Sequence, residues 1–204
     1  MNPSCPEGIK MNPLTDNEIM RALRDAEAIR AGHFILTSGR HSGTYVQCAR
    51  VLEDPALTTM LARAAVERLP EGIEIDLVAA PAVGGLIIGF AVAQALGVRF
   101  IFSEREQGKM VFRRSFEVPA HARVLVVEDV VTTGGSVAEV IDLVRCGGGE
   151  VVGVVSLIDR GGDKKFDTDF WPLLELEVES WEPGSCGLCE SGVPVYSPGS
   201  RRLA

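Results

Sequence analysis

The sequence predicts an α/β fold in which a central, mostly parallel sheet is flanked by helices. Short runs of branched apolar residues alternate with longer segments of helical periodicity, and capping or turn residues stand between them. With 204 residues, of which 46% are hydrophobic, the chain can bury one large core. We therefore expect a single domain over residues 1–204, with an N-terminal segment of about 1–45, a core of about 46–180 and a tail of 181–204.

Two helices are indicated by the residues that would cap them. The tetrapeptide TDNE at 15–18 has the pattern of a capping box, and the apolar spacing after it predicts a helix to about Ala31. Asp54 followed by Pro55 provides an N-cap and a proline suited to the first helical position. This pair predicts a second helix, which extends to about Leu69.

The middle of the chain alternates between strands and helices. Gly97 follows the helical segment 85–96 and is suited to end it. The segment 103–118 is rich in charge and alternates poorly, so we expect a mobile hairpin or flap there. The other expected elements are strands at 75–80, 98–102, 123–129 and within 147–160, and a helix at 136–146.

The charge balance restricts the class of partner. The net charge is −8, from 28 acidic and 20 basic residues. Domains that bind nucleic acid through bulk charge are usually basic, so no nucleic-acid partner is expected and any phosphate must be held locally. No apolar run approaches the length of a membrane span, and no charged segment followed by an apolar one opens the chain. We expect a cytoplasmic protein without a membrane partner.

The cysteines do not form a disulfide framework. Cys5, Cys48 and Cys146 are isolated, as reduced thiols would be. Cys186 and Cys189 form one CxxC, which is half of a tetrahedral zinc site unless a second chain completes it. The histidines lack the spacing of a metal site or a triad, and we expect surface or locally hydrogen-bonded roles for His33, His41 and His121. The sequence alone thus predicts no metal held by protein ligands.

The segment VLVVEDVVTTGGS at 124–136 presents an electrostatic conflict. A branched apolar strand ends in two adjacent carboxylates, and a loop suited to wrap an anion follows them. Two unit charges about 6 Å apart at an effective dielectric of about 20 repel by roughly 3 kcal/mol. The candidate residues are Glu128, Asp129, Val130, Val131, Thr132, Thr133, Gly134, Gly135 and Ser136.

A ribose 5-phosphate resolves this conflict. Its phosphate can occupy the loop, while its 2- and 3-hydroxyls donate to the carboxylates. The same carboxylates can stabilise positive charge that develops at the anomeric carbon. The chain has no G-x-x-x-x-G-K-[ST] and no G-x-G-x-x-G after a strand, so other phosphate loops fit less well. It also lacks a GxSxG or paired Cys/His nucleophile, which suits a mechanism without a covalent intermediate.

The same segment resembles the ribose-phosphate signature of the type I phosphoribosyltransferases. Within that group the chain is similar to the orotate phosphoribosyltransferase family at several separate places. FILTSGRHSGTY at 34–45 resembles its N-terminal substrate segment, and APAVGG at 80–85 its pyrophosphate loop. SLIDRGG at 156–162 resembles the strand end with its orotate-binding arginine, and CGLCESGVPVYSPGSR at 186–201 the tail of some bacterial members.

This resemblance implies the fold and the ligands of the site. The fold would carry a small hood and a flexible flap. Phosphoribosyl pyrophosphate, with Mg²⁺ bound through it, would occupy residues 128–136. Thr132 and Arg160 would contact orotate, whose planar carboxylate matches the fork of a guanidinium. An alternative is that Arg160 is a surface residue paired with Asp159 or Asp163.

The resemblance further implies that flap cations neutralise the departing pyrophosphate. Arg105 and Lys109 match the family pattern, and Lys109 would act in catalysis with Glu128 and Asp129. The flap commonly reaches the neighbouring subunit, so a homodimer is expected. Here the flap lacks a histidine, and Gly84 and Thr37 stand where relatives carry lysine. The diphosphate would then depend more on magnesium, or on reorganisation of Lys109, Arg113 and Arg114.

The resulting prediction is a pentosyltransferase of pyrimidine nucleotide biosynthesis. It would transfer ribose 5-phosphate from phosphoribosyl pyrophosphate to orotate and release orotidine monophosphate and pyrophosphate. Two alternatives remain open: a phosphoribosyltransferase for another base, and a non-catalytic regulator that senses phosphoribosyl pyrophosphate.

Overall fold

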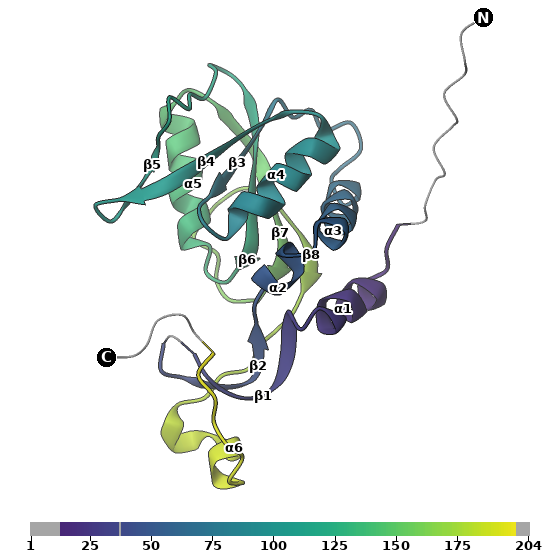
Figure 1. Cartoon of the computed structure of the whole chain (residues 1–204). Helices are drawn as coiled ribbons and strands as arrows, with labels where there is room; N and C mark the ends of the chain where they lie inside the picture. The colour runs from purple at the N-terminus through teal and green to yellow at the C-terminus, as the bar shows by residue number, and fades with distance from the viewer. Residues whose placement is uncertain (1–12, 37, 199–204) are drawn as a thin grey trace, which may run out of the picture.

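The computed structural model describes residues 13–36 and 38–198 (Figure 1). Thr37 and Cys5 lie outside the described residues, as do the ends of the expected N-terminal segment and tail. The helices are α1 (Asp16–Asp25), α2 (Ala49–Leu52), α3 (Pro55–Glu67), α4 (Gly85–Leu96), α5 (Gly135–Cys146) and α6 (Gly187–Glu190), and η1 (Pro183–Ser185) is a 3-10 turn. The strands are β1 (Ile29–Ile35), β2 (His41–Val46), β3 (Leu77–Pro81), β4 (Arg99–Glu106), β5 (Lys109–Phe112), β6 (Arg123–Val131), β7 (Glu150–Asp159) and β8 (Phe170–Glu175).

A six-stranded sheet forms the centre of the molecule, in the order β5-β4-β3-β6-β7-β8. All neighbours are parallel except β4 and β5, which form an antiparallel hairpin. Side chains of β6 alternate between two cores. Leu125 and Val127 pack in the cluster that contains residues of α1, α3 and α4, whereas Val124 and Val126 pack in the cluster with α5. Helices therefore cover both faces, which confirms the expected α/β class.

A smaller two-stranded unit, which we call the hood, lies below the sheet in Figure 1. The hood consists of the antiparallel hairpin β1–β2 and residues 176–198 of the tail. His41 exchanges two backbone hydrogen bonds of 2.8 Å with Trp181, and Tyr196 bonds to the backbone of His33 and Ile35 at the other edge. The tail therefore pairs with both edges of the hairpin instead of lying apart from it.

Two expected elements differ in the structure, and some strands were not expected. The first helix ends at Asp25, before the expected Ala31, because the amide of Ala28 turns back to Leu23 and β-branched Ile29 begins a strand. The strand expected at 98–102 continues to Glu106. Strand β8 was not predicted. Its side chains are mostly only partly buried, and a proline interrupts their pattern.

The expected flap is a regular hairpin of β4 and β5. Its two-residue turn consists of Gln107 and Gly108, with φ of 48° and 84°. Two positive φ angles are the geometry whose twist matches that of the flanking strands. The hairpin is therefore confirmed, whereas its mobility stays a prediction. Across residues 13–36 and 38–198, no helix is both long enough and apolar enough to cross a membrane.

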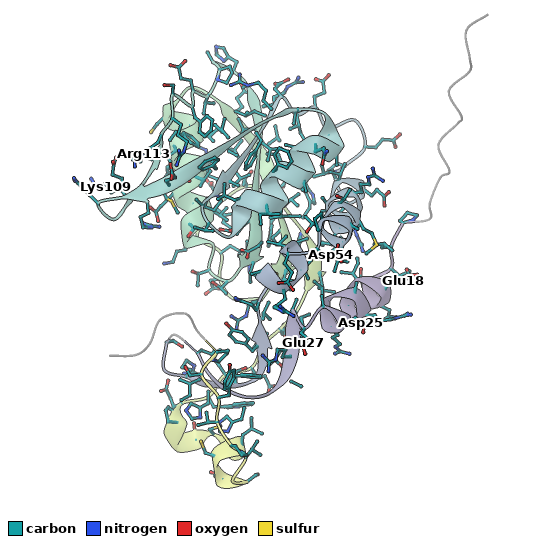
Figure 2. All side chains as sticks on the ribbon, in the orientation of Figure 1. Glu18, Asp25, Glu27, Asp54, Lys109 and Arg113 are labelled. Atoms are coloured by element: carbon teal, nitrogen blue, oxygen red, sulfur yellow. The ribbon has the colours of Figure 1, made fainter. Side chains whose placement is uncertain are left out.

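The N-cap of α3 provides a direct test of the helix assignments. Asp54 Oδ1 accepts hydrogen bonds from the amides of Ala56 (2.8 Å) and Leu57 (3.1 Å). We expect Asp54→Ala to lower the free energy of unfolding by about 1 kcal/mol, measured by urea denaturation. The control is Asp25→Ala, at the exposed end of α1 (Figure 2). Equal effects of the two substitutions would show that the cap contributes nothing.

Candidate active site at the carboxyl end of β6

Two adjacent acidic side chains lie at the carboxyl end of β6. Glu128 is only 8% exposed, and burial together with the charge of Asp129 raises its pKa to about 9. Burial also raises the pKa of Asp129. The nearest donors are backbone amides: Asp129 N donates to Glu128 Oε1 (3.2 Å) and Val130 N to Asp129 Oδ1 (2.8 Å). No cation from the described part of the chain pairs with these acids, which leaves them available to a ligand.

The loop after β6 leads into an open helix N-terminus. Gly134 has φ of 71°, and a Cβ there would lie 2.4 Å from a ring carbon of Phe166, so only glycine fits. The loop is fixed from the other side by Lys165 N, which donates to Thr133 O (2.8 Å). No side chain among the described residues caps α5. The first amides of this helix, from Gly135 onward, can therefore bind an anion.

A second helix N-terminus begins beside the same carboxylates. A Cβ on Gly84 would lie 2.6 Å from Asp129 Oδ1, and one on Gly85 would lie 2.9 Å from Val127 O. The two glycines let the loop before α4 approach β6 this closely. As at α5, no side chain in the described residues caps α4. The acids thus stand between two helix ends that each favour negative charge.

Other candidate residues of this loop are placed around the helix start. Val131 is buried, and its carbonyl accepts a 2.8 Å hydrogen bond from Arg160 N. Thr132 and Thr133 are exposed, and Ser136 is half-buried in the first turn of α5. Their hydroxyls and amides are therefore accessible to a ligand at this edge of the sheet.

Arg160 follows the end of β7, the strand next to β6. Its Nε is buried and has no hydrogen-bond partner among the described residues, and burial lowers the pKa of its guanidinium. Asp159 pairs with Lys164 Nζ at 2.7 Å. Neither Asp159 nor Asp163 pairs with the side chain of Arg160 in the described residues, so the alternative of an arginine held by one of them is wrong. A half-buried guanidinium without a partner among the described residues is suited to bind a carboxylate.

Comparisons with known proteins identify the family. A family model described as the phosphoribosyl transferase domain matches residues 48–187. The orotate phosphoribosyltransferase of Caldanaerobacter subterraneus subsp. tengcongensis is 46% identical over 187 residues, which are 91% of this chain and 98% of that protein. The orotate phosphoribosyltransferase of Heliobacterium modesticaldum is 47% identical over 190 residues, which are 92% of this chain and 100% of that protein. The chain belongs to the orotate phosphoribosyltransferase family.

A solved structure of this family agrees with the fold. The crystal structure of orotate phosphoribosyltransferase from Aeropyrum pernix matches with a TM-score of 0.69 at 25% identity and covers 78% of this chain and 94% of that one. The resemblance in the sequence and the α/β class expected from its pattern are thus both confirmed.

The two flap cations that the resemblance selected lie in different surroundings. Arg105 makes a two-point contact with Glu139 of α5, at 2.8 and 3.2 Å. Lys109 begins β5 at the hairpin tip, and Figure 2 shows it pointing outward from the body, near Arg113. The structure therefore ties Arg105 to α5 and leaves Lys109 at the tip of the hairpin. The roles of both cations stay predictions.

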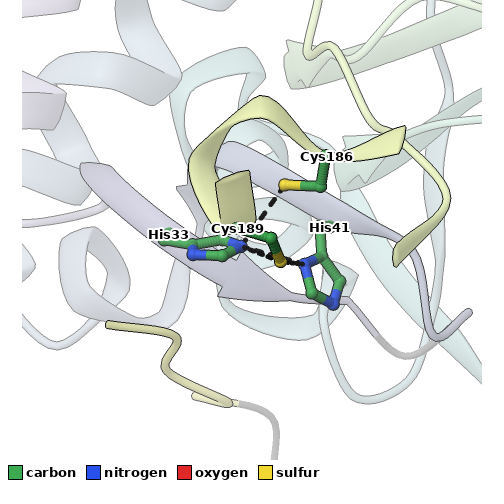
Figure 3. Close-up of side chains that lie close together, drawn as sticks. All are labelled: His33, His41, Cys186 and Cys189. Atoms are coloured by element: carbon green, nitrogen blue, oxygen red, sulfur yellow. Dashed lines mark hydrogen bonds between the residues drawn. The ribbon is translucent and has the colours of Figure 1, made fainter. Parts of the chain in front are cut away.

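The expectation of a surface position is wrong for two histidines, although both are hydrogen-bonded. His33 and His41 are 3% and 7% exposed, and they meet Cys186 and Cys189 in the hood (Figure 3). Sequence spacing did not reveal this cluster because the cysteines lie about 150 positions after the histidines. The family resemblance was the one signal in the sequence that pointed to this region, because it included the segments 34–45 and 186–201. It did not show that these two segments are in contact.

The raised pKa of Glu128 predicts a pH-dependent stability. The pKa of Glu128 is about 9 in the folded protein and 4.5 in its ordinary, unfolded surroundings. Between pH 4.5 and pH 9 the folded protein therefore binds more protons at this group than the unfolded protein does. Stability due to this group must therefore fall as the pH rises from 4.5 to 9. Because glutamine does not ionise, we expect Glu128→Gln to be more stable at pH 8 by at least about 1 kcal/mol, or ~3 °C in Tm.

Thermal melts from pH 4 to pH 9 would measure this difference, which should vanish near pH 4. The matched control is Glu67→Gln, at the exposed end of α3. A Glu128→Gln melt that parallels the unsubstituted protein at every pH would show that Glu128 ionises normally.

Proposed function

We propose that this chain transfers ribose 5-phosphate from phosphoribosyl pyrophosphate to orotate. The observation that carries the proposal is the buried pair Glu128 and Asp129 between the open N-termini of α4 and α5. An acid pair between two anion sites suits a ligand with phosphates at both ends and hydroxyls between them. Phosphoribosyl pyrophosphate has this order of groups, and the names of the relatives support orotate as its partner.

The ribose would lie over the acids. Its 2- and 3-hydroxyls donate to Glu128 and Asp129, and hydrogen bonds to the ionised form lower a carboxyl pKa. The 5-phosphate accepts from the amides at the start of α5, together with the hydroxyls of Thr132, Thr133 and Ser136. The loop before α4 faces the pyrophosphate. Both acids are thereby ionised next to the anomeric carbon.

The reaction breaks the bond from the anomeric carbon to the diphosphate oxygen and forms a bond from that carbon to a ring nitrogen of orotate. The proton of that nitrogen would leave with the diphosphate. Glu128 and Asp129 stabilise the positive charge that develops on the sugar. The carboxylate oxygens fit a hard cation, so we propose that Mg²⁺ enters bound to phosphoribosyl pyrophosphate, where it supplies positive charge to the leaving group. The protein's other contributions are orientation and the exclusion of water by the flap.

Arg160 would bind the carboxylate of orotate. Its guanidinium is half-buried, with a buried Nε that has no partner in the described residues, so a ligand carboxylate would relieve the cost of removing that charge from water. Thr132 begins the phosphate loop, and besides its hydroxyl contact with the 5-phosphate it would contact the base. Another base without a carboxylate would leave Arg160 unpaired, and this favours orotate over purines.

The assay that tests this function follows the loss of orotate absorbance with phosphoribosyl pyrophosphate and Mg²⁺. We expect turnover only when all components are present, and little or none with uracil, hypoxanthine or adenine. Turnover with one of these bases and not with orotate would support the alternative transferase. Binding of phosphoribosyl pyrophosphate without turnover of any base would support the regulator.

The first substitution addresses the base. Arg160→Lys keeps the charge but removes the fork, so we expect kcat/KM for orotate to fall by about 10- to 100-fold. The KM for phosphoribosyl pyrophosphate should change less than about threefold, because that substrate would bind at β6. The control is Arg145→Lys, an exposed arginine at the end of α5. An equal loss for both substrates would remove Arg160 from base recognition.

We further propose a homodimer in which the flap serves the neighbouring site. Exposed apolar side chains gather where the loop before α4 continues into that helix: Val83 is 81% exposed, Ile87 51% and Phe90 60%. A partner covering them would remove this surface from water. Lys109 stands at the hairpin tip and points outward from the body, a position suited to reach across to a partner.

Mixing two inactive variants tests the shared site. We expect Lys109→Ala to lower kcat by about 10- to 1000-fold while affinity for phosphoribosyl pyrophosphate stays mostly intact. Asp129→Asn should lower affinity and turnover together. An equimolar mixture, refolded or exchanged, should regain up to about a quarter of full activity, because half the dimers would hold one intact site. Arg63→Ala, on the exposed face of α3, is the control.

Absence of recovery would contradict the shared site, and unchanged turnover in Lys109→Ala would remove Lys109 from the mechanism.

A cytoplasmic location completes the proposal. The free thiols of Cys48, Cys146, Cys186 and Cys189 fit a reducing compartment.

A further inference from the structure

We propose that His33, His41, Cys186 and Cys189 form a zinc site that ties the two ends of the chain together in the hood. One ligand atom from each residue lies within 4.8 Å of all the others. The two histidines come from β1 and β2, and the two cysteines flank the first turn of α6 (Figure 3). The proposal does not depend on the transferase activity.

The distances between the ligand atoms match those around a tetrahedral ion. Zinc bonds of about 2.0 Å to nitrogen and about 2.3 Å to sulfur place two nitrogens about 3.3 Å apart, and a nitrogen and a sulfur about 3.6 Å apart. His33 Nε2 and His41 Nδ1 are 2.9 Å apart. Cys186 Sγ is 3.4 Å and Cys189 Sγ 3.7 Å from His33 Nε2, and Cys189 Sγ is 3.3 Å from His41 Nδ1. The four atoms thus surround a space of the right size.

A hydrogen bond outside the cluster orients one of the histidines. His33 Nδ1 lies 2.8 Å from the carbonyl oxygen of Val193, which can only accept. The proton of the neutral ring is therefore on Nδ1, and Nε2 directs its lone pair at the cluster. Metal-ligating histidines usually donate their other ring nitrogen in this way. Val193 belongs to the tail, so both the ligands and their support come from the same two segments.

The backbone around the cluster is already fixed. His41 is paired with Trp181, and the amide of Cys189 donates to Cys186 O at 3.0 Å, which closes a tight CxxC turn. A bound ion would add a link between positions 41 and 186 in sequence. Because a link across so long a segment removes much chain entropy from the unfolded state, it would stabilise the hood.

The ligand set and its burial favour a structural zinc ion. Two thiolates and two imidazoles are a common set for tetrahedral zinc, and hard cations such as Mg²⁺ prefer oxygen. Cys186 is 1% exposed and both histidines are buried, whereas Cys189 lies at the exposed side of the cluster. Four protein ligands leave no open position for a substrate. The ion would therefore stabilise the hairpin that carries Arg40 and Tyr45, which lie on the segment similar to the family's substrate segment.

Metal analysis of the purified full-length protein tests the proposal. We expect about one zinc per chain by elemental analysis, and less than about 0.1 in Cys186→Ser/Cys189→Ser. Cys146→Ser is the matched control, because this exposed thiol stands alone at the end of α5, and it should keep the ion. His121→Ala is the control for loss of a histidine outside the hood.

Reconstitution keeps the test decisive if the double variant fails to fold. The unsubstituted protein is stripped with a chelator and titrated with Co²⁺, which should bind once per chain and give the absorption of a tetrahedral thiolate complex. Zinc should displace it and raise Tm. Less than about 0.1 zinc per chain with no cobalt complex would overturn the proposal, as would a mass 2 Da lower from a Cys186–Cys189 disulfide in freshly purified protein.

Discussion

The burial of Glu128 next to Asp129 is the constraint on which the active site depends. Folding places two carboxylates at the end of β6 with no cation from the described residues, and it raises the pKa of Glu128 to about 9. A structure that only had to be stable would not keep this pair. The cost becomes understandable if a ligand supplies hydroxyl donors and positive charge at this point. The two carboxylates are then already positioned to stabilise the transition state, and the protein without ligand is less stable as a result.

The surrounding backbone follows from the same constraint. Gly84 and Gly85 let α4 begin against β6, and Gly134 lets α5 begin against Phe166. Both helices are left without side-chain caps from the described chain, so each can accept an anion on its own side of the acids. Arg160 completes the arrangement after the neighbouring strand, with a half-buried guanidinium whose buried Nε has no partner in the described part of the chain. The helix N-termini and Arg160 are suited to negative groups of a ligand, and the acid pair between the helix ends is suited to hydroxyl groups. A phosphorylated sugar and a base with a carboxylate have these groups.

The sequence predicted the parts of this structure that depend on local pattern. The branched run before Glu128, the glycines after it and the helix ended by Gly97 all follow from residue preferences within a few positions. The early end of α1 depends on a local turn at Ala28, whereas strand β8 and the histidine–cysteine cluster depend on contacts between distant segments. Periodicity carries no information on such contacts, and the 145 positions between His41 and Cys186 hid a possible ion site. The position of the flap relative to the acids likewise depends on a partner or a ligand.

The proton balance of substrate binding tests most directly whether the sugar contacts the acids. Calorimetric titration with Mg²⁺ and phosphoribosyl pyrophosphate at pH 8, in buffers of different ionisation enthalpy, measures the protons exchanged per site. If the ribose hydroxyls donate to Glu128, its pKa falls below 8 on binding, and the site should release between about half a proton and one proton. Glu128→Gln should release almost none. Binding without proton release, or with equal release in both proteins, would contradict contact between the sugar and the buried carboxylates.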